Sequence, residues 1–349
     1  MKGSVIALDQ FRGREAAVLM VDGQIEDLVI DPADDVLAPD TILRGRLGRP
    51  VKGLGGAFVD LPGGASGFLR ATDGLRPGSN VLVQVTGLPE DGKALPVSTR
   101  LLFKSRYVIV TPGAPGLNIS RSIEDDALRA ELDALARAGM AGADAALGLI
   151  LRSACAEADD DQITDDIAQM RALAEQVLAD TDGPPEVLLD APGAHMAAWR
   201  DWPAPDLLDD QPGSFARHSV IEGIEGLLSP RVGLPGGGHM LIEPTAALVA
   251  VDVNTGSDTS PAAGLKANIA TIRDLPRQLR LRGLGGQVVI DFAPFPKKER
   301  HIVEQSLRAA FRRDGRDTVL AGWTPLGCFE LTRKRDRMTL AQVLGKSAP

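Results

Sequence analysis

The chain has few of the residues that mark disulfide-stabilised, zinc-binding or membrane-spanning proteins. Only two of its 349 residues are cysteine, Cys155 and Cys328, and they lie too far apart to form a CxxC pair. This argues against a disulfide framework and against a self-contained zinc site. No apolar run approaches the ~20 residues that span a bilayer, and the N-terminus lacks a signal-peptide pattern. We therefore expect a soluble, cytoplasmic protein without a membrane span.

Aromatic residues are also scarce, and the charge is unevenly distributed. Aromatic side chains make up 4% of the chain and hydrophobic residues 44%, so we expect cores of Leu, Val, Ile and Ala in two or three domains. The net charge of -9 does not by itself suggest a nucleic-acid partner. Between Lys266 and Arg337, however, 16 Lys and Arg stand against 8 Asp and Glu. Such a basic region is typical either of a surface that binds a polyanion or of a solvated helix face.

Two short apolar runs each end in an aspartate. Residues 246–251 precede Asp252 and Asn254, and residues 287–290 precede Asp291. These runs predict core strands of an α/β sheet, and ligands bind at the carboxyl ends of such strands. Two carboxylates and an amide oxygen are ligands suited to Mg²⁺ or Mn²⁺, which indicates phosphoryl or phosphodiester chemistry. The alternative is that each aspartate only forms a turn.

The order of predicted elements divides the chain into parts. The first 36 residues are predicted to form strands, with Asp22-Gly23 as a hairpin turn. Residues 37–106 hold short strands separated by Gly and Pro, which predicts a small barrel of OB type. Phe58 and Phe68 fall on successive strands of this barrel, near basic residues, and either stack on nucleic-acid bases or belong to the core.

The remainder of the chain is predicted to be mixed α/β, with a loop over 203–214. Strands are expected over 147–151, 238–242, 246–251, 287–290 and 318–321, and helices over 127–138, 162–179, 263–282 and 298–313.

Several blocks of sequence resemble the catalytic half of the bacterial ribonuclease E/G family, and the similarity spans essentially the whole chain. The strongest blocks are residues 248–256, 277–286, 289–292, 325–327 and 330–333, and further ones are 21–24, 57–60, 67–69, 105–107 and 119–121. The resemblance implies an endoribonuclease that uses Mg²⁺ to hydrolyse single-stranded RNA to 5′-phosphate and 3′-hydroxyl ends. Its role would be in RNA processing or mRNA decay.

The resemblance also implies an α/β fold of several subdomains. An RNase H-like subdomain over 1–36 and 216–261 would be interrupted by an OB-fold RNA-binding domain over 37–106 and by a 5′-sensor over 107–215. A DNase-I-like subdomain over 262–349 would follow. Asp252 and Asp291 match the family's Mg²⁺-binding aspartates, and Asn254 matches the nearby asparagine that positions the attacking water or the scissile phosphate.

Two further pairs of residues match RNA-binding positions of the family. Phe58 and Phe68 match the base-stacking aromatics of the OB fold. Arg152 and Ser153 match an Arg-Thr pocket for a 5′-monophosphate, and a guanidinium beside a hydroxyl suits a terminal phosphate. Four of the five residues from Glu157 to Asp161 are acidic, however, and an acidic run near this pocket is expected to repel RNA.

Two other departures from the family concern assembly and the active centre. The family's paired-cysteine zinc motif is not found, so we expect no structural zinc and a monomer or a dimer without a zinc link. Asp317 stands where relatives have a basic residue near the active centre, and Arg316 could substitute for it by a one-residue shift. Two other readings stay open: an RNA-binding paralogue without catalysis, and a metal-dependent phosphatase of another α/β class.

Overall fold

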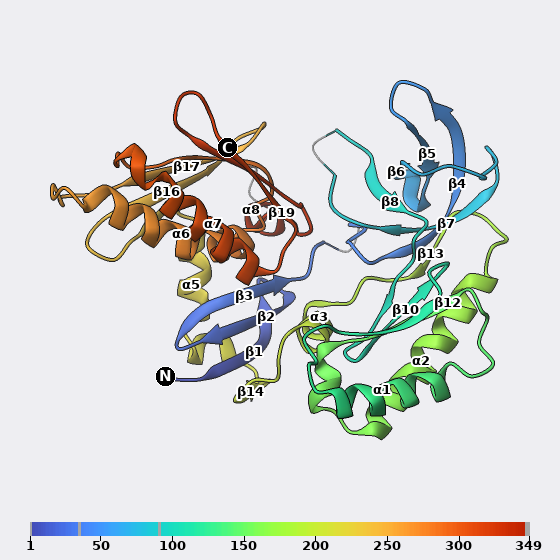
Figure 1. The fold of residues 1–349 in the computed structure, drawn as a ribbon. Coiled ribbons are helices and arrows are strands. Elements are labelled where there is room, and N and C mark those ends of the chain that lie inside the picture. The colour runs from blue at the N-terminus through green and yellow to red at the C-terminus, as the bar shows by residue number, and fades with distance from the viewer. Residues whose placement is uncertain (1, 34–35, 90–91, 346–349) are drawn as a thin grey trace. The chain divides into compact units, whose positions relative to one another are not determined.

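The computed structural model describes residues 2–33, 36–89 and 92–345 of the chain. They form two compact units, which are coloured by position along the chain in Figure 1. One unit combines the chain up to residue 34 with the chain from Pro205 onward, and the other consists of residues 35–204. The second unit is therefore an insertion into the first, and each unit is a mixed α/β structure with sheets of its own.

The N-terminal strands of the first unit form a four-stranded sheet in the order β14-β1-β2-β3. Asp22 and Gly23 both have positive φ angles, 50° and 80°, which a two-residue turn between β2 and β3 requires. Phe215 and Ile224, from two short helices, pack against this sheet. The elements are β1 (Ser4–Phe11), β2 (Arg14–Val21), β3 (Gln24–Ile30), β14 (Leu207–Asp209), α4 (Ser214–Arg217) and α5 (Val220–Leu227).

The prediction of a loop over 203–214 is wrong for the three residues of β14. They pair in parallel with β1, with Leu207 opposite Val5. Leu207 and Leu208 remain 47% and 54% exposed. No alternation of buried and exposed residues therefore marks the strand in the sequence, and backbone hydrogen bonds alone define it.

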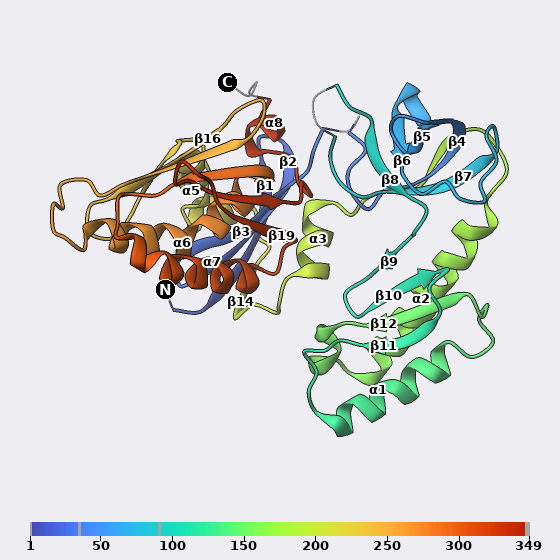
Figure 2. The same ribbon diagram turned by 45° about the horizontal axis from the view of Figure 1, so that its top comes forward.

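The second sheet of this unit has six strands in the order β15-β16-β17-β18-β20-β19. Helices α6 and α7 lie side by side along one of its faces, as Figure 2 shows. Val249, Val251 and Val253 of β17 point toward that face and belong to the core that the helices share with the sheet. The elements are β15 (Arg231–Gly233), β16 (His239–Pro244), β17 (Val249–Asn254), α6 (Ala263–Leu281), β18 (Gly286–Asp291), η3 (Lys297–Glu299), α7 (Arg300–Asp314), β19 (Thr318–Trp323), β20 (Phe329–Arg333) and α8 (Leu340–Val343).

Helix α6 begins in tight contact with the segment that follows β18. A Cβ atom on Gly264 would lie 1.9 Å from the carbonyl oxygen of Pro294, so only glycine allows this approach. One turn later, the fully buried side chain of Asn268 donates to the carbonyl of Ala293 (2.9 Å) and accepts from its N–H (3.0 Å). These contacts fix the backbone immediately after Asp291.

A cluster of ion pairs joins the N-terminal sheet to the six-stranded sheet. Asp27 of β3 accepts from Arg337, at 3.1 Å to Nη2, and has Arg280 and Arg316 at 3.8 Å. Arg280 also pairs with Asp314 at the end of α7. The Asp27 side chain is only 11% exposed, so solvent screens these interactions weakly.

The insertion contains a barrel of five strands. Strand β4 pairs with β5 along one part of its length and with β7 along another, which closes the order β4-β5-β6-β8-β7. Leu43, Val59 and Val83 fill its interior. The elements are β4 (Ile42–Val51), β5 (Gly56–Asp60), η1 (Pro62–Gly64), β6 (Ser66–Leu69), β7 (Asn80–Val85), β8 (Leu95–Ser98) and β13 (Glu186–Leu189), which pairs with the start of β4.

The rest of the insertion is a four-stranded sheet in the order β11-β12-β10-β9, with α1 and α2 packed against it. The helices expected over 127–138 and 162–179 are confirmed as α1 and α2, and the strand over 147–151 as β12. The elements are β9 (Phe103–Lys104), β10 (Val108–Pro112), β11 (Gly116–Ile119), α1 (Asp126–Gly139), β12 (Leu147–Leu151), η2 (Ser153–Glu157), α2 (Asp160–Ala179) and α3 (Ala194–Asp201).

The ion-pair cluster predicts a pH-dependent contribution to stability. Burial alone would raise the pKa of Asp27, but its bonds and charge contacts with Arg337, Arg316 and Arg280 outweigh burial and lower the pKa below 3.8. The stabilisation is therefore fully present above about pH 4 and is lost as the pH falls through the lower pKa of the folded state. We expect Asp27→Asn to cost about 3–5 kcal/mol at pH 7, because it removes the largely buried carboxylate that Arg337, Arg316 and Arg280 share.

Urea unfolding of the wild type and of Asp27→Asn from pH 7 to pH 3 checks this expectation. The difference in unfolding free energy should shrink at the acid end of the range. An equal difference at every pH would contradict the role given to the charge of Asp27.

Candidate active site and nucleic-acid surfaces

The two aspartates of the sequence motif lie opposite one another on neighbouring parallel strands. Asp252 of β17 is the register partner of Asp291 of β18. Both are exposed, and both alternate with buried valine or isoleucine, so they project from the face of the sheet that α6 and α7 do not cover. Neighbouring strands are ~4.8 Å apart, which puts the two carboxylates within reach of a single ion.

Asn254 lies two residues after Asp252 and projects from the same face. Its Nδ2 donates a hydrogen bond of 2.7 Å to Oδ2 of Asp252. The amide therefore orients that carboxylate and leaves Oδ1 of Asp252 and the carboxylate of Asp291 for a ligand. His239 of β16 stands opposite Asn254. The histidines show no metal-ligand spacing in the sequence, so the sequence did not indicate that His239 lies beside this site.

The donor set around the two aspartates is small. In the described ranges, no three His, Cys, Asp or Glu side chains come together as ligands. Mg²⁺ typically binds through one or two carboxylates and keeps several waters, whereas Zn²⁺ sites need three or four protein ligands. Asp252 and Asp291 therefore fit a magnesium ion and do not fit a protein-bound zinc.

The structure corrects the expected position of Asp252. The sequence predicted a strand over 246–251 with Asp252 just beyond its end. Strand β17 instead runs from Val249 to Asn254, because β16 continues to pair with it as far as His239 opposite Asn254. Asp252 is therefore held inside the ladder, while Asp291 is the last residue of β18.

The basic region between Lys266 and Arg337 is not confined to the part of the sheet where the two aspartates lie. Much of it lies on α6 and α7, which cover the opposite face of the sheet. Several of its arginines are also committed to partners within the protein. Arg277 pairs with Asp274, Arg280 and Arg333 pair with Asp314, Arg316 pairs with Asp336, and Arg337 pairs with Asp27. The excess of positive charge in this region is therefore partly structural.

Arg316 and Asp317 are also distant from the site. Thr318 is aligned with Arg333 and Gly286, at the start of β18, whereas Asp291 is at its end. Gly286 and Asp291 are five residues apart along β18, which corresponds to roughly 16 Å. Arg316 is moreover engaged by Asp336, so the expectation that it substitutes for a basic residue at the active centre is wrong.

Phe58 and Phe68 form an aromatic pair on the outside of the barrel. They are direct cross-strand partners on β5 and β6, and their ring centroids are 5.4 Å apart at an interplanar angle of 67°. Phe58 is 40% exposed, whereas its neighbours Ala57 and Val59 are fully buried. The core alternative for Phe58 is therefore excluded, and the rings face solvent where a base could stack.

The residues beside this pair are suited to the same surface. Lys52 and Arg70 are exposed close to it in the chain. A Cβ atom on Gly56 would lie 2.8 Å from Cζ of Phe68, so glycine at this position leaves room for the ring on the barrel wall.

Arg152, expected in a 5′-phosphate pocket, already has protein acceptors. It follows β12, and its Nη1 donates to the carbonyls of Ser105 and Arg200, the latter at 3.0 Å. Its Nη2 donates to Oδ1 of Asp201 at 2.9 Å. Ser153 begins η2 and is exposed. The sequence gave no signal for Asp201, which is 49 residues away.

The acidic run from Glu157 to Asp161 has a structural role. It leads into the N-terminus of α2, with Asp159 as N-cap and Asp160 and Asp161 in the first turn. The N–H of Asp159 donates to Oε1 of Gln162 at 3.3 Å. Negative charge at this end of a helix offsets the helix dipole.

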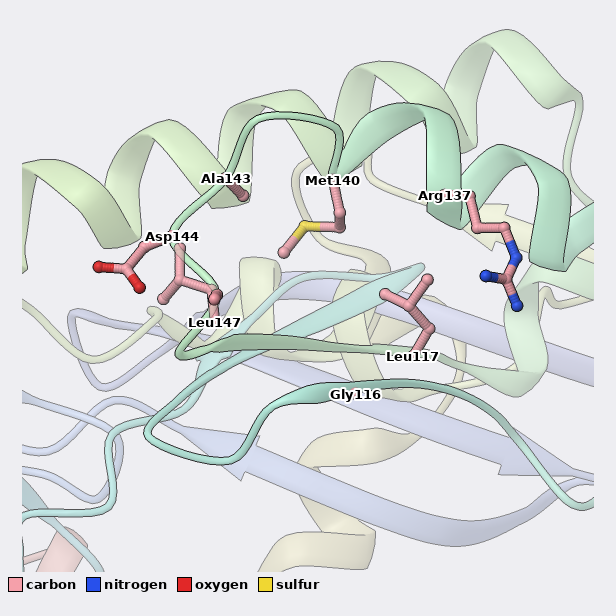
Figure 3. A pocket seen from close by; sticks show the side chains of 8 residues that line it. Gly116, Leu117, Arg137, Met140, Ala143, Asp144 and Leu147 are labelled. Carbon is pink, nitrogen blue, oxygen red and sulfur yellow. The ribbon is translucent and has the colours of Figure 1, made fainter.

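A shallow cavity of about 260 Å³ lies between α1 and the strands β11 and β12 (Figure 3). Met140 and Ala143 line it from the helix side, Leu117 and Leu147 from the strand side, and Arg137 and Asp144 lie at its two ends. Leu147 begins β12, whereas Arg152 follows its last residue. The cavity and Arg152 therefore lie at opposite ends of this sheet.

The model of the ribonuclease E/G family matches residues 103–209 and 205–336, more than half of the chain, and the chain belongs to this family. It is 28% identical over 392 residues to ribonuclease E of Nostoc sp., which covers 96% of this chain and 56% of that protein. It is 28% identical over 370 residues to ribonuclease G of Haemophilus influenzae, and this match covers 88% of this chain and 74% of that protein. It is 27% identical over 406 residues to ribonuclease G of Escherichia coli K12, and this match covers 96% of this chain and 81% of that protein. The chain thus spans little more than half of the Nostoc relative.

No helix in the described part of the chain is long and apolar enough to cross a membrane.

The outward position of Phe58 predicts that its removal hardly affects folding. Phe58→Ala should cost about 1 kcal/mol of unfolding free energy, mainly from the lost aromatic pair. Leu69→Ala, in the barrel interior directly after Phe68 on β6, should cost about 2–5 kcal/mol because it leaves a cavity. Thermal or urea unfolding of both variants measures the contrast, and equal losses would mean that Phe58 is a core residue.

Proposed function

We propose that this chain is a Mg²⁺-dependent endoribonuclease, with Mn²⁺ as a second usable ion. It hydrolyses single-stranded RNA to 5′-phosphate and 3′-hydroxyl ends, in RNA processing or mRNA decay. The observation that carries the proposal is the register pairing of Asp252 with Asp291 on the open face of one sheet. Membership of the ribonuclease E/G family supports it.

Asp252 and Asp291 would hold the ion. Bound between them, Mg²⁺ would lower the pKa of a coordinated water and offset negative charge on the scissile phosphate. Asn254 would keep the Asp252 carboxylate in a fixed orientation through its 2.7 Å hydrogen bond. Asn268 would hold the backbone that follows Asp291 through its two bonds to Ala293. A rigid site of this kind requires little reorganisation when the substrate binds.

Phe58 and Phe68 would bind RNA by stacking on its bases. Stacking on an aromatic ring tolerates any base, which suits a surface for single strands of varied sequence. Lys52 and Arg70 would attract the phosphate backbone beside the rings. This barrel is the part of the chain that we propose as an OB-fold RNA-binding domain.

The other subdomains are proposed from the remaining sheets. The N-terminal sheet with α4 and α5 would be the RNase H-like part, and the sheet of β9 to β12 with α1 and α2 the 5′-sensor. The six-stranded sheet would be the DNase-I-like part. Because β17 and β18 pair directly, we place the start of that part ahead of β15 instead of at residue 262.

The state of assembly that we propose is a monomer or a dimer without a zinc link. Zinc binds cysteine as the thiolate. Burial raises the pKa of Cys155 to about 11, and its thiol donates to the carbonyl of Tyr107 at 3.2 Å. Cys155 is therefore a poor zinc ligand at neutral pH.

Substitution of either aspartate tests the proposal. We expect Asp252→Asn and Asp291→Asn each to slow cleavage of a fluorescent single-stranded RNA in Mg²⁺ by at least about 100-fold, because several kcal/mol of transition-state stabilisation depend on the ion. RNA affinity in EDTA should not change. The matched control is Glu243→Gln, which should cleave normally. Glu243 is an exposed carboxylate on β16, on the same face of the sheet as Asp252.

Two other outcomes would contradict the proposal. Unchanged cleavage in either aspartate variant would remove the assigned site. Wild-type protein that binds RNA but never cleaves it with Mg²⁺ or Mn²⁺ would favour the RNA-binding paralogue.

The aromatic pair gives a separate expectation for RNA binding. Phe58→Ala and Phe68→Ala should each weaken the binding of a short single-stranded RNA by about 1–3 kcal/mol. Leu54→Ala, which removes a 59% exposed apolar side chain between β4 and β5, is the control and should have little effect. Fluorescence anisotropy in EDTA separates this measurement from cleavage, and equal losses in all three variants would contradict specific stacking.

A further inference from the structure

Aromatic rings pack together at the strand end that carries Asp291. The ring of Phe292, the next residue, has its centroid 5.8 Å from that of Trp323 on β19. Phe329, the register partner of Ile290, packs edge-on against the same ring, with the centroids 5.2 Å apart. Trp323 therefore lies at the same end of the six-stranded sheet as Asp291.

The guanidinium of Arg300 lies over the ring of Trp323. Arg300 is the first residue of α7, and its Cζ atom is 4.6 Å from the centroid of the ring. The indole is itself held in place, because its Nε1 donates to Oε1 of Glu304 at 2.7 Å. A guanidinium that stacks on an aromatic ring keeps N–H donors at the edge of its plane for an anion.

The Arg300 side chain has no anionic partner among the residues that the structure describes. It makes no ion pair or hydrogen bond there, and its contact is with the Trp323 ring. Arg280, Arg316 and Arg337, by contrast, all pair with carboxylates. Arg300 is also half-buried. A partly buried cation without a carboxylate beside it is suited to an anion from outside the chain.

The turn between β19 and β20 brings Arg300 near the strand end of Asp291. A Cβ atom on Gly327 in this turn would lie 3.8 Å from Nη2 of Arg300. Gly327 precedes Phe329 by two residues, and Phe329 pairs with Ile290, the residue before Asp291. The guanidinium is therefore on the order of 15 Å from Asp291. A few nucleotides of a single strand cover such a distance.

This end of the sheet is accessible. Leu326, at the tip of the same turn, is 96% exposed. The turn is held by a hydrogen bond of 2.8 Å from the N–H of Thr324 to the carbonyl of Cys328. The two lysines of η3, which directly precede α7, are exposed as well. An uncovered surface and positive charge thus meet beside Arg300.

We propose that Arg300, seated on Trp323, binds a backbone phosphate of the RNA strand a few nucleotides from the linkage that is cut. The inference rests on the proposed function, since it takes RNA as the ligand and the two aspartates as the place of cleavage. The N–H groups of a guanidinium match the free oxygens of a phosphodiester in geometry and charge. The strand would pass around the end of the sheet, from the face with the aspartates to the start of α7.

The test uses a 3′-labelled single-stranded RNA that the wild type cuts at one linkage in Mg²⁺. Arg300→Gln should lower kcat/KM by about tenfold, mainly through a higher KM, because it removes a charged contact that bound substrate and transition state share. Arg308→Gln is the matched control and should cleave as the wild type does. Arg308 is an exposed arginine roughly 12 Å further along the same helix.

A second set of substrates locates the phosphate. In each substrate, one linkage other than the cut one is replaced by an uncharged methylphosphonate. The wild type should lose about tenfold in kcat/KM at one linkage near the cut. Arg300→Gln should lose little at that linkage, since the partner of the phosphate is already gone. Arg308→Gln should follow the wild type at every linkage.

If Arg300→Gln does not fold, as judged by circular dichroism, Arg300→Lys replaces it. Lysine keeps the charge but lacks the planar fork, so the loss at the same methylphosphonate linkage should be smaller than in the wild type.

The outcomes separate the two proposals. A folded Arg300 variant that cleaves as Arg308→Gln does, or that shows the wild-type losses at every methylphosphonate linkage, overturns the assignment of Arg300 and leaves the proposed function intact. Absence of cleavage by the wild type in Mg²⁺ and in Mn²⁺ overturns the proposed function and the inference with it.

Discussion

The ion-pair cluster around Asp27 is the constraint on which the first unit depends. The unit is built from two stretches of chain separated by 170 inserted residues. Asp27 comes from the first stretch, and Arg280, Arg316 and Arg337 from the second. Four side chains of opposite charge, largely removed from water, can satisfy one another only if β3 lies against the end of the six-stranded sheet. The cluster therefore specifies how the two stretches pair.

The same cluster uses part of the basic charge of this chain inside the protein. A positive balance between Lys266 and Arg337 is a reasonable sign of a polyanion surface, yet several of these arginines are used to assemble the unit. The proposed catalytic face carries the opposite sign, with Asp252 and Asp291 exposed on it. In the proposed function, a cation held by the two aspartates would offset the charge of the substrate.

The sequence predicted the elements whose periodicity is strong and the pair of aspartates that end apolar runs. Strand β12 was found where a short apolar run placed it, and helices α1 and α2 where 3.6-residue spacing placed them. The sequence could not predict β14, because a three-residue edge strand with exposed leucines has no pattern. It could not predict Asp201 either, because the contact with Arg152 depends on how α3 folds back onto the end of β12. Arg316 was misassigned because chain proximity does not reveal that β19 begins at the far end of the sheet.

The order β14-β1-β2-β3 has a consequence for the architecture as a whole. The insertion leaves the first unit after β3, at one edge of this sheet, and returns at β14, at the other edge. Across the sheet, Ile30 is aligned with Asp9 of β1, and Leu207 is aligned with Val5 of β1. The exit and the return of the insertion are therefore separated by about three strand spacings across the sheet and by four residues along the strands. That distance is roughly 20 Å, which six or seven extended residues can cover. A short linker could therefore replace the barrel and the four-stranded sheet of β9 to β12, which makes the inserted unit a separable module of the chain.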